Sequence, residues 1–522
     1  MKVRLLFPDR DADLAAQPSP GSDDLVDDLD LGPVLETMVP GRRLEKLCPA
    51  VLFNPLTDPE QIRWRQHVLS DALANPDAMR HLFDLAGRAL ESQHSVWMWS
   101  GRTADSLLSK SVHGLRALLP LLRELAGLAA QQLATVRSAG LSELYRRLID
   151  ELDASYLDQV AAVLTHLTFP EGVVTRAHLT NSGLIGDMEL LAPASNHRSL
   201  WARLGFAPPG RQHFTIAERD EAGARALAEM RDDALHDAAG TLAEANAHVV
   251  GFFRQLQWEA GFYVGCLQLY RKLQAAGVGT CWPNPGPDGA ELSAEGLVSL
   301  SLAVRSGRAP TPNDLAGPSV PLAIVTGANQ GGKTTLLRSI GCAQLLLQAG
   351  AFVPASAYRA SLATALHTHF RRAEDDDLRS GKLDEELARM STIVDRCHPG
   401  DLLLMNESFA STDEVEGSWI AADVIDALIG HGVRVVLVTH FHALAQHYLS
   451  RPGTVFLVAE RLPDGRRSHR VLPGRPQATS HGLDIFRQSF GETSPETSPV
   501  TAGAPTPGQH LGPGVLEGGN LT

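Results

Sequence analysis

Apolar residues recur at three- and four-residue spacing through most of the first half of the chain. The pattern extends over about 36–282 and is clearest over 107–133 and 227–273. This spacing places apolar side chains along one face of a helix, so we predict a mostly helical domain. The stretch 227–273 contains no proline, and it predicts one or two very long helices if its glycines are tolerated.

The pattern changes inside this helical half. Between about 168 and 216, turn residues alternate with short β-like runs, such as 172–175 and 213–216. Such runs, bounded by glycine, proline and asparagine, are typical of strands. We therefore expect a β-containing insertion near 168–216.

The second half follows a Pro/Gly/Asp stretch at 283–289. Four runs rich in leucine and β-branched residues are separated in several places by helical patterns; they cover 322–326, 402–405, 433–439 and 454–458. Buried strands that alternate with helices indicate a largely parallel sheet covered on both faces. The predicted fold class is thus a helical domain followed by an α/β domain over 283–490.

The two ends of the chain are compositionally distinct. Residues 1–35 include five clustered aspartates, which predicts a solvated acidic lead-in. Residues 491–522 consist largely of Gly, Pro, Thr and Ser. Such a tail buries too little apolar surface to fold, and we expect it to be disordered.

Composition excludes some classes of function. The 522 residues carry 46 basic and 60 acidic side chains, for a net charge of −14. This balance argues against a polycationic, histone-like binder, although an acidic protein can still present a local basic groove. Five scattered cysteines without a CxxC pair indicate reduced thiols. No export signal and no apolar run of about 18 residues is visible, so we expect a cytoplasmic protein with no membrane contact.

A glycine-rich motif carries the strongest chemical signal. It fits G-x-x-x-x-G-K-[ST] between a predicted strand and a predicted helix, which is the context of a phosphate-binding loop. Glycines let backbone N–H groups turn toward phosphates, and the helix N-terminus adds positive potential. Lys333 would reach the β- and γ-phosphates, and the Thr334 hydroxyl would ligate Mg²⁺. The candidate nucleotide-binding residues are Gly327, Ala328, Asn329, Gln330, Gly331, Gly332, Lys333, Thr334 and Thr335.

Two further strands end in candidate catalytic groups. The strand at 402–405 is followed by Asn406 and Glu407, where a Walker B motif has a metal-binding Asp and a Glu that polarises water. Asn406 can still accept a hydrogen bond from a metal-bound water, but it adds no charge. Glu407 is the candidate general base. His440 ends another predicted strand and could contact a γ-phosphate; a metal site with His442 and His447 is the alternative interpretation.

Taken together, these segments resemble the ATPase domain of MutS mismatch-repair proteins. The resemblance is specific over about 310–490 and weaker over about 40–280. Its matching segments are Pro312–Asp314, the glycine-rich motif, Gly350–Ala355, Asp376–Leu378 with Ser380–Gly381, Asn406–Glu407, Ser411–Thr412, Glu416–Gly417, Thr439–Phe441, Ser480–Leu483 and, upstream, Pro55–Asp58 with Ile62, Arg65 and Gln66.

The resemblance implies a helical core (lever) domain followed by an ABC-class P-loop ATPase domain. It also implies a homodimeric clamp that binds ATP and Mg²⁺ at a subunit interface and acts on duplex or branched DNA in repair or recombination, with further repair proteins as partners. Three departures qualify it. Asn406 replaces the usual Asp, so turnover is expected to be weak. Leu383–Glu386 occupies the region of the trans-acting signature serine. The chain before Pro55 is too short for a mismatch-reading domain, and Phe169-Pro170-Glu171 is interpreted as a chance match to its wedge motif.

Two other functions remain open from the sequence. One is a nucleotide-gated clamp that grips another protein, with weak ATPase activity and no DNA binding. The other is an ATPase of a different ABC-type chromosome family, against which the segments at 352–355 and 480–483 count.

Overall fold

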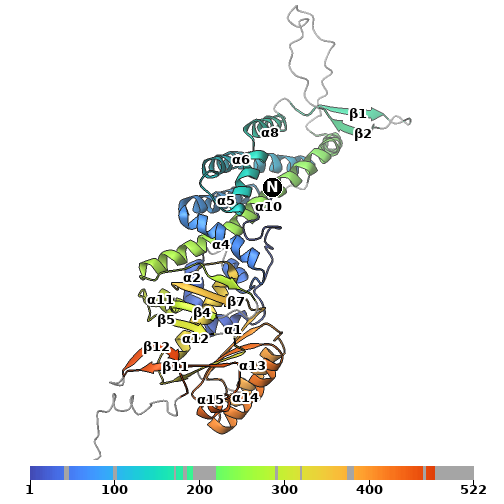
Figure 1. The fold of residues 1–522 in the computed structure, drawn as a ribbon. Coiled ribbons are helices and arrows are strands. Elements are labelled where there is room, and N and C mark those ends of the chain that lie inside the picture. Colours follow the sequence, from blue (N-terminus) through green and yellow to red (C-terminus); the bar gives the residue numbers. More distant parts are fainter. Residues whose placement is uncertain are drawn as a thin grey trace, which may run out of the picture. The chain divides into compact units, whose positions relative to one another are not determined.

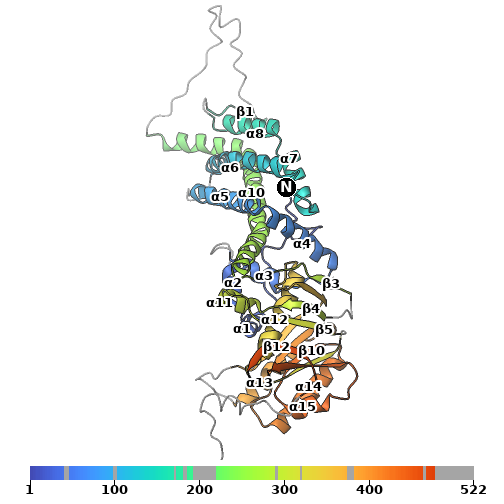
Figure 2. The same ribbon diagram turned by 60° about the vertical axis from the view of Figure 1, so that its left-hand side comes forward.

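A computed structural model describes residues 1–39, 46–97, 103–169, 172–179, 181, 185–191, 219–287, 292–317, 320–372, 381–462 and 466–476, all within one compact unit, Met1–Ser480. Figures 1 and 2 show their arrangement. The predicted β-like run at 213–216, the segments Asp376–Leu378 and Ser480–Leu483, and the C-terminal tail lie outside these residues.

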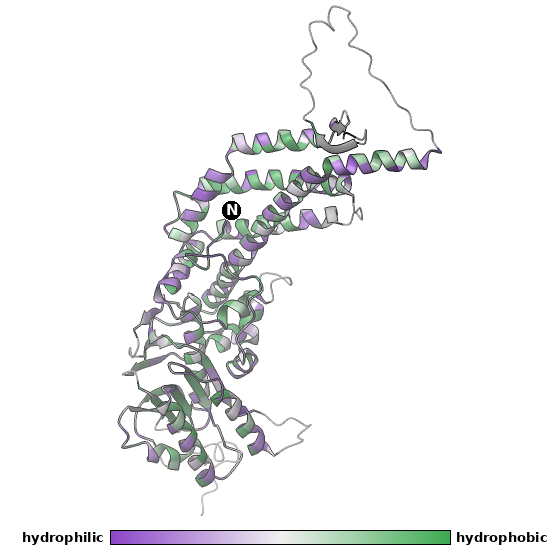
Figure 3. Cartoon of the chain, turned by 90° about the vertical axis from the view of Figure 1, so that its right-hand side faces the viewer, coloured by the Kyte–Doolittle hydropathy of each residue, from purple (hydrophilic) through white to green (hydrophobic). Residues whose placement is uncertain are grey.

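The first half is helical, as the pattern predicts. Its helices are α1 (Ser22–Asp28), α2 (Gly32–Met38), α3 (Leu47–Leu52), α4 (Pro59–Ala74), α5 (Pro76–Trp97), α6 (Ala104–Gln132), α7 (Ala139–Glu151), α8 (Ala154–His166) and α10 (Glu221–Ala275). Between α8 and α10, β1 (Thr175–Leu179) pairs with β2 (Ile185–Leu190) in an antiparallel hairpin. Figure 3 shows apolar and polar residues alternating along these helices.

The stretch with no proline forms a single helix, α10, of 55 residues. It packs along α5 and α6 and then against α2 and α3 (Figure 2). The Asp220 side chain caps its first turn by accepting a 2.9 Å hydrogen bond from the Gly223 N–H. A glycine is required at Gly265, because a Cβ there would lie 2.4 Å from the Met38 carbonyl oxygen. The other glycines of the stretch 227–273 are accommodated within the helix.

The expectation of a solvated acidic lead-in is wrong for much of residues 1–35. Leu5 and Leu6 are buried, and the Glu259 carboxylate of α10 accepts hydrogen bonds from both of their N–H groups, at 2.6 and 2.9 Å. In α1, Leu25 and Asp28 are buried as well. The aspartates are concentrated on one short helix whose apolar positions face the core, and charge clustering alone does not reveal that face.

The described residues of the second half form two sheets. Its strands are β3 (Asn284–Gly286), β4 (Leu292–Leu297), β5 (Asn313–Gly317), β6 (Leu322–Gly327), β7 (Ala357–Ser361), β8 (Leu366–Phe370), β9 (Leu402–Asn406), β10 (Arg434–Val438), β11 (Thr454–Arg461) and β12 (Arg467–Pro473). Its helices are α11 (Leu300–Ser306), α12 (Lys333–Ala349), α13 (Lys382–Val394), α14 (Glu414–Gly430) and α15 (His442–His447).

Among the described residues, a six-stranded sheet has the order β12-β11-β6-β10-β9-β8, and a four-stranded sheet has the order β3-β7-β4-β5. The first sheet is parallel except for the antiparallel edge strand β12. The four predicted strands are β6, β9, β10 and β11, and the parallel arrangement is confirmed. The four-stranded sheet was not predicted. Part of the Pro/Gly/Asp stretch at 283–289 forms its edge strand β3, parallel to β7.

The six-stranded sheet is covered on both faces. In β10, Val436 and Val438 pack into the hydrophobic cluster that contains α12, while Val435 and Leu437 pack into the cluster of α13, α14 and α15. Alternate side chains of a strand point to opposite faces, so a near-continuous apolar run serves two layers. The cluster around α12 continues into α2–α7 and α10, and the helical and α/β halves therefore share one hydrophobic core.

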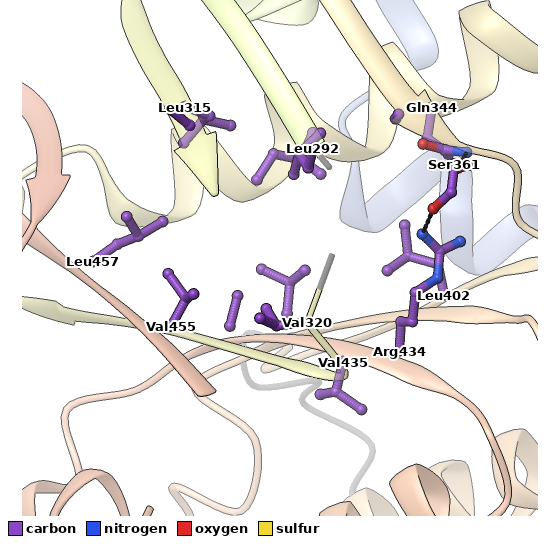
Figure 4. Close-up of a pocket in the computed structure, with 15 residues that line it drawn as sticks. Leu292, Leu315, Val320, Gln344, Ser361, Leu402, Arg434, Val435, Val455 and Leu457 are labelled. Atoms are coloured by element: carbon purple, nitrogen blue, oxygen red, sulfur yellow. Dashed lines mark hydrogen bonds between the residues drawn. The ribbon is translucent and has the colours of Figure 1, made fainter. Parts of the chain in front are cut away.

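A small cavity of about 90 Å³ lies between the two sheets (Figure 4). Its lining is mainly aliphatic, with Leu292 and Leu315 from one sheet and Val455 and Leu457 from the other. Its polar corner is the Arg434 guanidinium, which donates to the Ser361 hydroxyl. The cavity contains no candidate catalytic group named from the sequence.

All five cysteines carry free thiols. Within the described residues, none of the helices has both the length and the apolar character that crossing a membrane requires.

Candidate functional site

The glycine-rich loop connects β6 to α12. Gly327 ends the strand with φ +108° and Gly332 precedes the helix with φ +93°, conformations that side chains with a Cβ rarely adopt. A Cβ at Gly331 would also lie 2.7 Å from the Cβ of Ala459 on β11. The glycines thus permit a tight loop against the neighbouring strand. The first turn of α12 presents free N–H groups beside this loop, which favours an anion there.

The loop encloses its own lysine. Lys333 is 6% exposed, and its Nζ donates to the Gly327 carbonyl at 2.8 Å. The Ala328 carbonyl and the Asn329 side-chain oxygen each lie 3.4 Å from the same nitrogen. Burial lowers the pKa of Lys333, and the nearby Glu407 carboxylate opposes that effect. A buried ammonium group therefore lies at the first turn of α12.

Two oxygen ligands meet beside the lysine. The Thr334 hydroxyl donates a 2.9 Å hydrogen bond to the side-chain oxygen of Asn406 at the end of β9. Strand β10 separates β6 from β9, so these groups meet only because all three strands end at one edge of the sheet. Hydroxyl and amide oxygens are ligands that hard cations such as Mg²⁺ accept, directly or through water. The donor set fits such an ion, although it supplies no negative charge.

Glu407 and His440 form a pair at the same edge. Val438 of β10 is in register with Asn406 of β9, which places the residues that follow each strand side by side. Glu407 has φ +52°, and its N–H donates to the Val438 carbonyl at 2.9 Å. Its carboxylate accepts from the His440 N–H at 3.1 Å and also contacts the ring Nδ1. The hydrogen bond to Glu407 raises the pKa of His440, while burial acts in the opposite direction.

A cleft of about 620 Å³ lies over this edge. Most of the predicted residues line it, namely Asn329, Gln330, Gly331, Gly332, Lys333, Thr334, Thr335 and Glu407. Gly327, Ala328, Asn406 and His440 lie beside the cleft and contact its lining residues. The structure thus brings the predicted groups together. His440, however, does not line the cleft and contacts it through Glu407.

Sequence reasoning missed part of the lining. Leu302 of α11, the stretch Ala309–Thr311, Asn313 of β5 and His469 of β12 complete the cleft. Asn313 joins β5 to β12, because its side-chain oxygen accepts a 2.7 Å hydrogen bond from the Val471 N–H. Its location next to Pro312 and Asp314 in a matching segment was the available signal. His469 and Leu302 carry no sequence motif.

The segment Leu383–Glu386, which occupies the region of the family's signature serine, lies on α13. There Glu386 is 8% exposed and its carboxylate accepts a 3.0 Å hydrogen bond from the Ser411 hydroxyl. Its backbone carbonyl contacts His369 Nε2 at 3.1 Å, and His369 Nδ1 lies 2.7 Å from the Ser408 hydroxyl. Burial lowers the pKa of His369 to about 4. Glu386 is therefore tied to the chain after β9 and points into its own α/β domain.

The alternative interpretation, a metal site formed by His440, His442 and His447, gains no support. Among the described residues, His440, His442 and His447 do not form a group with converging ligand atoms. His442 instead contacts the Gln446 side chain at 3.2 Å within α15.

Comparisons with known proteins agree with this division of the chain. Residues 57–276 match the family model described as the MutS2 N-terminal domain, and residues 323–485 match MutS domain V. The fold and the site therefore define a protein in which a helical region precedes a MutS-type ATPase domain. The chain belongs to the MutS family.

Individual relatives match only part of this chain. The Geobacillus kaustophilus protein named endonuclease MutS2 is 34% identical over 182 residues, which are 34% of this chain and 23% of the relative. The DNA mismatch repair protein MutS of Synechococcus sp. is 33% identical over 220 residues, 41% of this chain and 24% of the relative. The DNA mismatch repair protein MutS of Thermus aquaticus is 31% identical over 195 residues, which are 35% of this chain and 24% of the relative. The chain spans about a quarter of the length of these relatives.

Proposed function

We propose that this protein binds and hydrolyses ATP with Mg²⁺ and uses the nucleotide to gate a dimeric clamp on DNA in repair or recombination. The observation that supports it best is the convergence of Lys333, Thr334, Asn406 and Glu407 at one sheet edge beside a cleft, within the MutS domain V match. The groups follow two strands, β6 and β9, that are not neighbours in the sheet, and phosphoryl transfer requires this combination of cation, metal ligand and base.

The residues take distinct roles in this proposal. The loop N–H groups from Gly327 to Thr335 and the Lys333 ammonium bind the phosphates. Thr334 and Asn406 hold Mg²⁺, which when bound supplies positive charge to the phosphate oxygens. Glu407 orients a water molecule and accepts its proton. His440 contacts the Glu407 carboxylate through its ring Nδ1 and its backbone N–H. Glu407 gives up this contact when it binds the water molecule.

Exposed side chains on α14 support a homodimer. Val415 and Trp419 are 76% and 74% exposed and lie one helical turn apart, next to the matching segment at Glu416–Gly417. Two large apolar side chains so exposed on one helix face are typical of an interaction site. We propose that a second copy of the chain covers them. A dimer through this helix would place two nucleotide clefts in one assembly.

Packed elements connect the cleft to the helical half. Leu302 of α11 lines the cleft, and Arg305 of the same helix pairs with Asp30 in the N-terminal segment. Asp28 of that segment accepts, through its carbonyl, a 2.8 Å hydrogen bond from Arg338 of α12. Leu5 and Leu6 are held by Glu259 on α10. We propose that nucleotide-dependent movement of α11 and α12 reaches α10 through this segment.

The test combines ATP turnover with DNA binding across salt concentration. For the proposed function, we expect ATP hydrolysis and a steep negative slope of log affinity against log salt, because phosphate contacts release counterions. Turnover with no measurable DNA binding at any salt concentration would favour the protein-gripping clamp instead. Absence of both ATP binding and DNA binding would overturn the proposal.

A further inference from the structure

Three potential metal ligands converge at the end of the sheet opposite the cleft. His367 is the second residue of β8, Asp401 directly precedes β9, and Cys397 lies three residues after the end of α13. Strands β8 and β9 are parallel, with Leu366 in register with Leu402. The imidazole and the carboxylate therefore meet at the amino edge of the sheet, and the connection from α13 brings the thiol to them.

The ligand atoms are close and largely shielded from water. One ligand atom from each of the three residues lies within 4.8 Å of the other two. His367 Nε2 is 3.0 Å from Asp401 Oδ2. Cys397 is 7% exposed, and Asp401 is fully buried. A tetrahedral zinc ion holds its ligand atoms roughly 3 to 4 Å apart, so small side-chain rotations would suffice.

One carboxylate oxygen of Asp401 is not explained by the protein's own hydrogen bonds. Oδ2 is satisfied by His367 and by the His398 N–H at 2.8 Å. Oδ1 is buried and has no hydrogen-bond partner among the described residues. Buried polar atoms are normally satisfied, and a cation would satisfy this one.

We propose that His367, Cys397 and Asp401 bind a zinc ion, with water completing a four-coordinate site. An imidazole, a thiolate and a carboxylate are ligands that Zn²⁺ accepts together, whereas Mg²⁺ and Ca²⁺ prefer oxygen ligands alone. The thiol proton leaves on binding. The ion fastens the C-terminal end of α13 to two neighbouring strands. Its binding does not depend on ATP.

The experiment uses the full chain, freed of metal by chelation and titrated with Zn²⁺ in competition with a chromophoric chelator. We expect one Zn²⁺ per chain, and an affinity weakened roughly tenfold or more in Cys397→Ser, His367→Gln and Asp401→Asn. The matched control is Cys281→Ser, which removes a half-buried thiol outside the cluster and should bind zinc as the unaltered chain does.

A second measurement does not depend on the variants folding. Co²⁺ added to the unaltered chain should give tetrahedral d–d absorption and a thiolate-to-cobalt charge-transfer band, which Cys281→Ser retains. Absence of stoichiometric zinc binding, absence of the charge-transfer band, or zinc affinity unchanged in a folded Cys397→Ser variant would overturn the proposal. The cluster would then be an ordinary His–Asp pair beside a buried thiol.

Discussion

The Thr334 hydroxyl donates a 2.9 Å hydrogen bond to the side-chain oxygen of Asn406. Thr334 lies in the first turn of α12, the helix that follows β6, and Asn406 is the last residue of β9. In the proposed function, Thr334 and Asn406 take the places of the P-loop threonine and the Walker B acid that share a magnesium ion in P-loop ATPases. Asn406 preserves the oxygen but removes the charge. Such a site would hold Mg²⁺ more weakly than one that contains a carboxylate.

Replacing Lys333 with Ala should weaken ATP binding by roughly tenfold or more, because it removes the buried cation from the loop and its charge-assisted hydrogen bonds. Equilibrium binding of a fluorescent ATP analogue would measure this change. The control is Lys272→Ala in the last turn of α10. Equal affinity in the Lys333 variant and the unaltered protein would refute the assignment of the loop.

Replacing Asn406 with Asp should tighten Mg²⁺-ATP binding or raise the rate of hydrolysis, since the carboxylate adds charge at the metal site. The adjacent Glu407 limits the gain, because two neighbouring carboxylates raise the pKa of one of them. Titration with Mg²⁺ at fixed ATP separates the two effects. If this variant changes neither quantity while Glu407→Gln abolishes turnover, ligands other than Asn406 hold the metal.

The Glu407–His440 pair predicts a pH-dependent stability. The pKa of His440 is raised above its ordinary value of 6.5, so the pair stabilises the folded state fully below pH 6.5. That contribution is lost as pH rises through the raised pKa. His440 is 39% exposed, so solvent screening keeps the effect below about 1 kcal/mol.

Urea unfolding of His440→Asn should therefore show destabilisation at pH 5.5 that disappears toward alkaline pH. His166→Asn, at an exposed position in α8, is the matched control. A loss of stability that is the same at every pH would mean that the ion pair is not the cause.

Replacing Glu259 with Gln should lower the free energy of unfolding by about 1–3 kcal/mol, because a buried acceptor of backbone N–H groups is lost. Its carboxylate accepts from Leu5, Leu6 and Ala12, and an amide NH₂ cannot take over both oxygen positions. Denaturant unfolding measures the change against Glu244→Gln, an exposed site on the same helix. Equal stability of the two variants would show that the N-terminal segment is not held by Glu259.

DNA affinity, where present, should be nearly equal for matched and G·T duplexes, because phosphate spacing hardly changes at a single mispair. Phe169 is partly buried and packs against the hydrophobic core, which leaves it poorly placed as a wedge; Pro170 and Glu171 lie outside the described residues. A competition titration at one salt concentration with homoduplex, a G·T duplex and a four-way junction tests this. A roughly tenfold G·T preference that Phe169→Ala removes would make this motif a wedge.

Local patterns were sufficient for much of the architecture. The absence of proline over 227–273 allowed one or two very long helices to be predicted where α10 forms, and apolar runs identified β6, β9, β10 and β11. The glycine-rich loop could be located because its strand, turn and helix are contiguous in sequence. Each of these features depends on residues within a few positions of one another, where backbone preference and periodicity act directly.

Tertiary structure alone decided the rest. Sheet order brings Asn406 to Thr334, His469 to the cleft and His367 to Asp401. The positions of α11 and of the connection after α13 bring Leu302 to the cleft and Cys397 to His367 and Asp401. The buried state of Leu5 and Leu6 likewise follows from Glu259, more than 250 residues later. These contacts join segments far apart in the chain. Their formation depends on the packing of whole layers, which local periodicity does not encode.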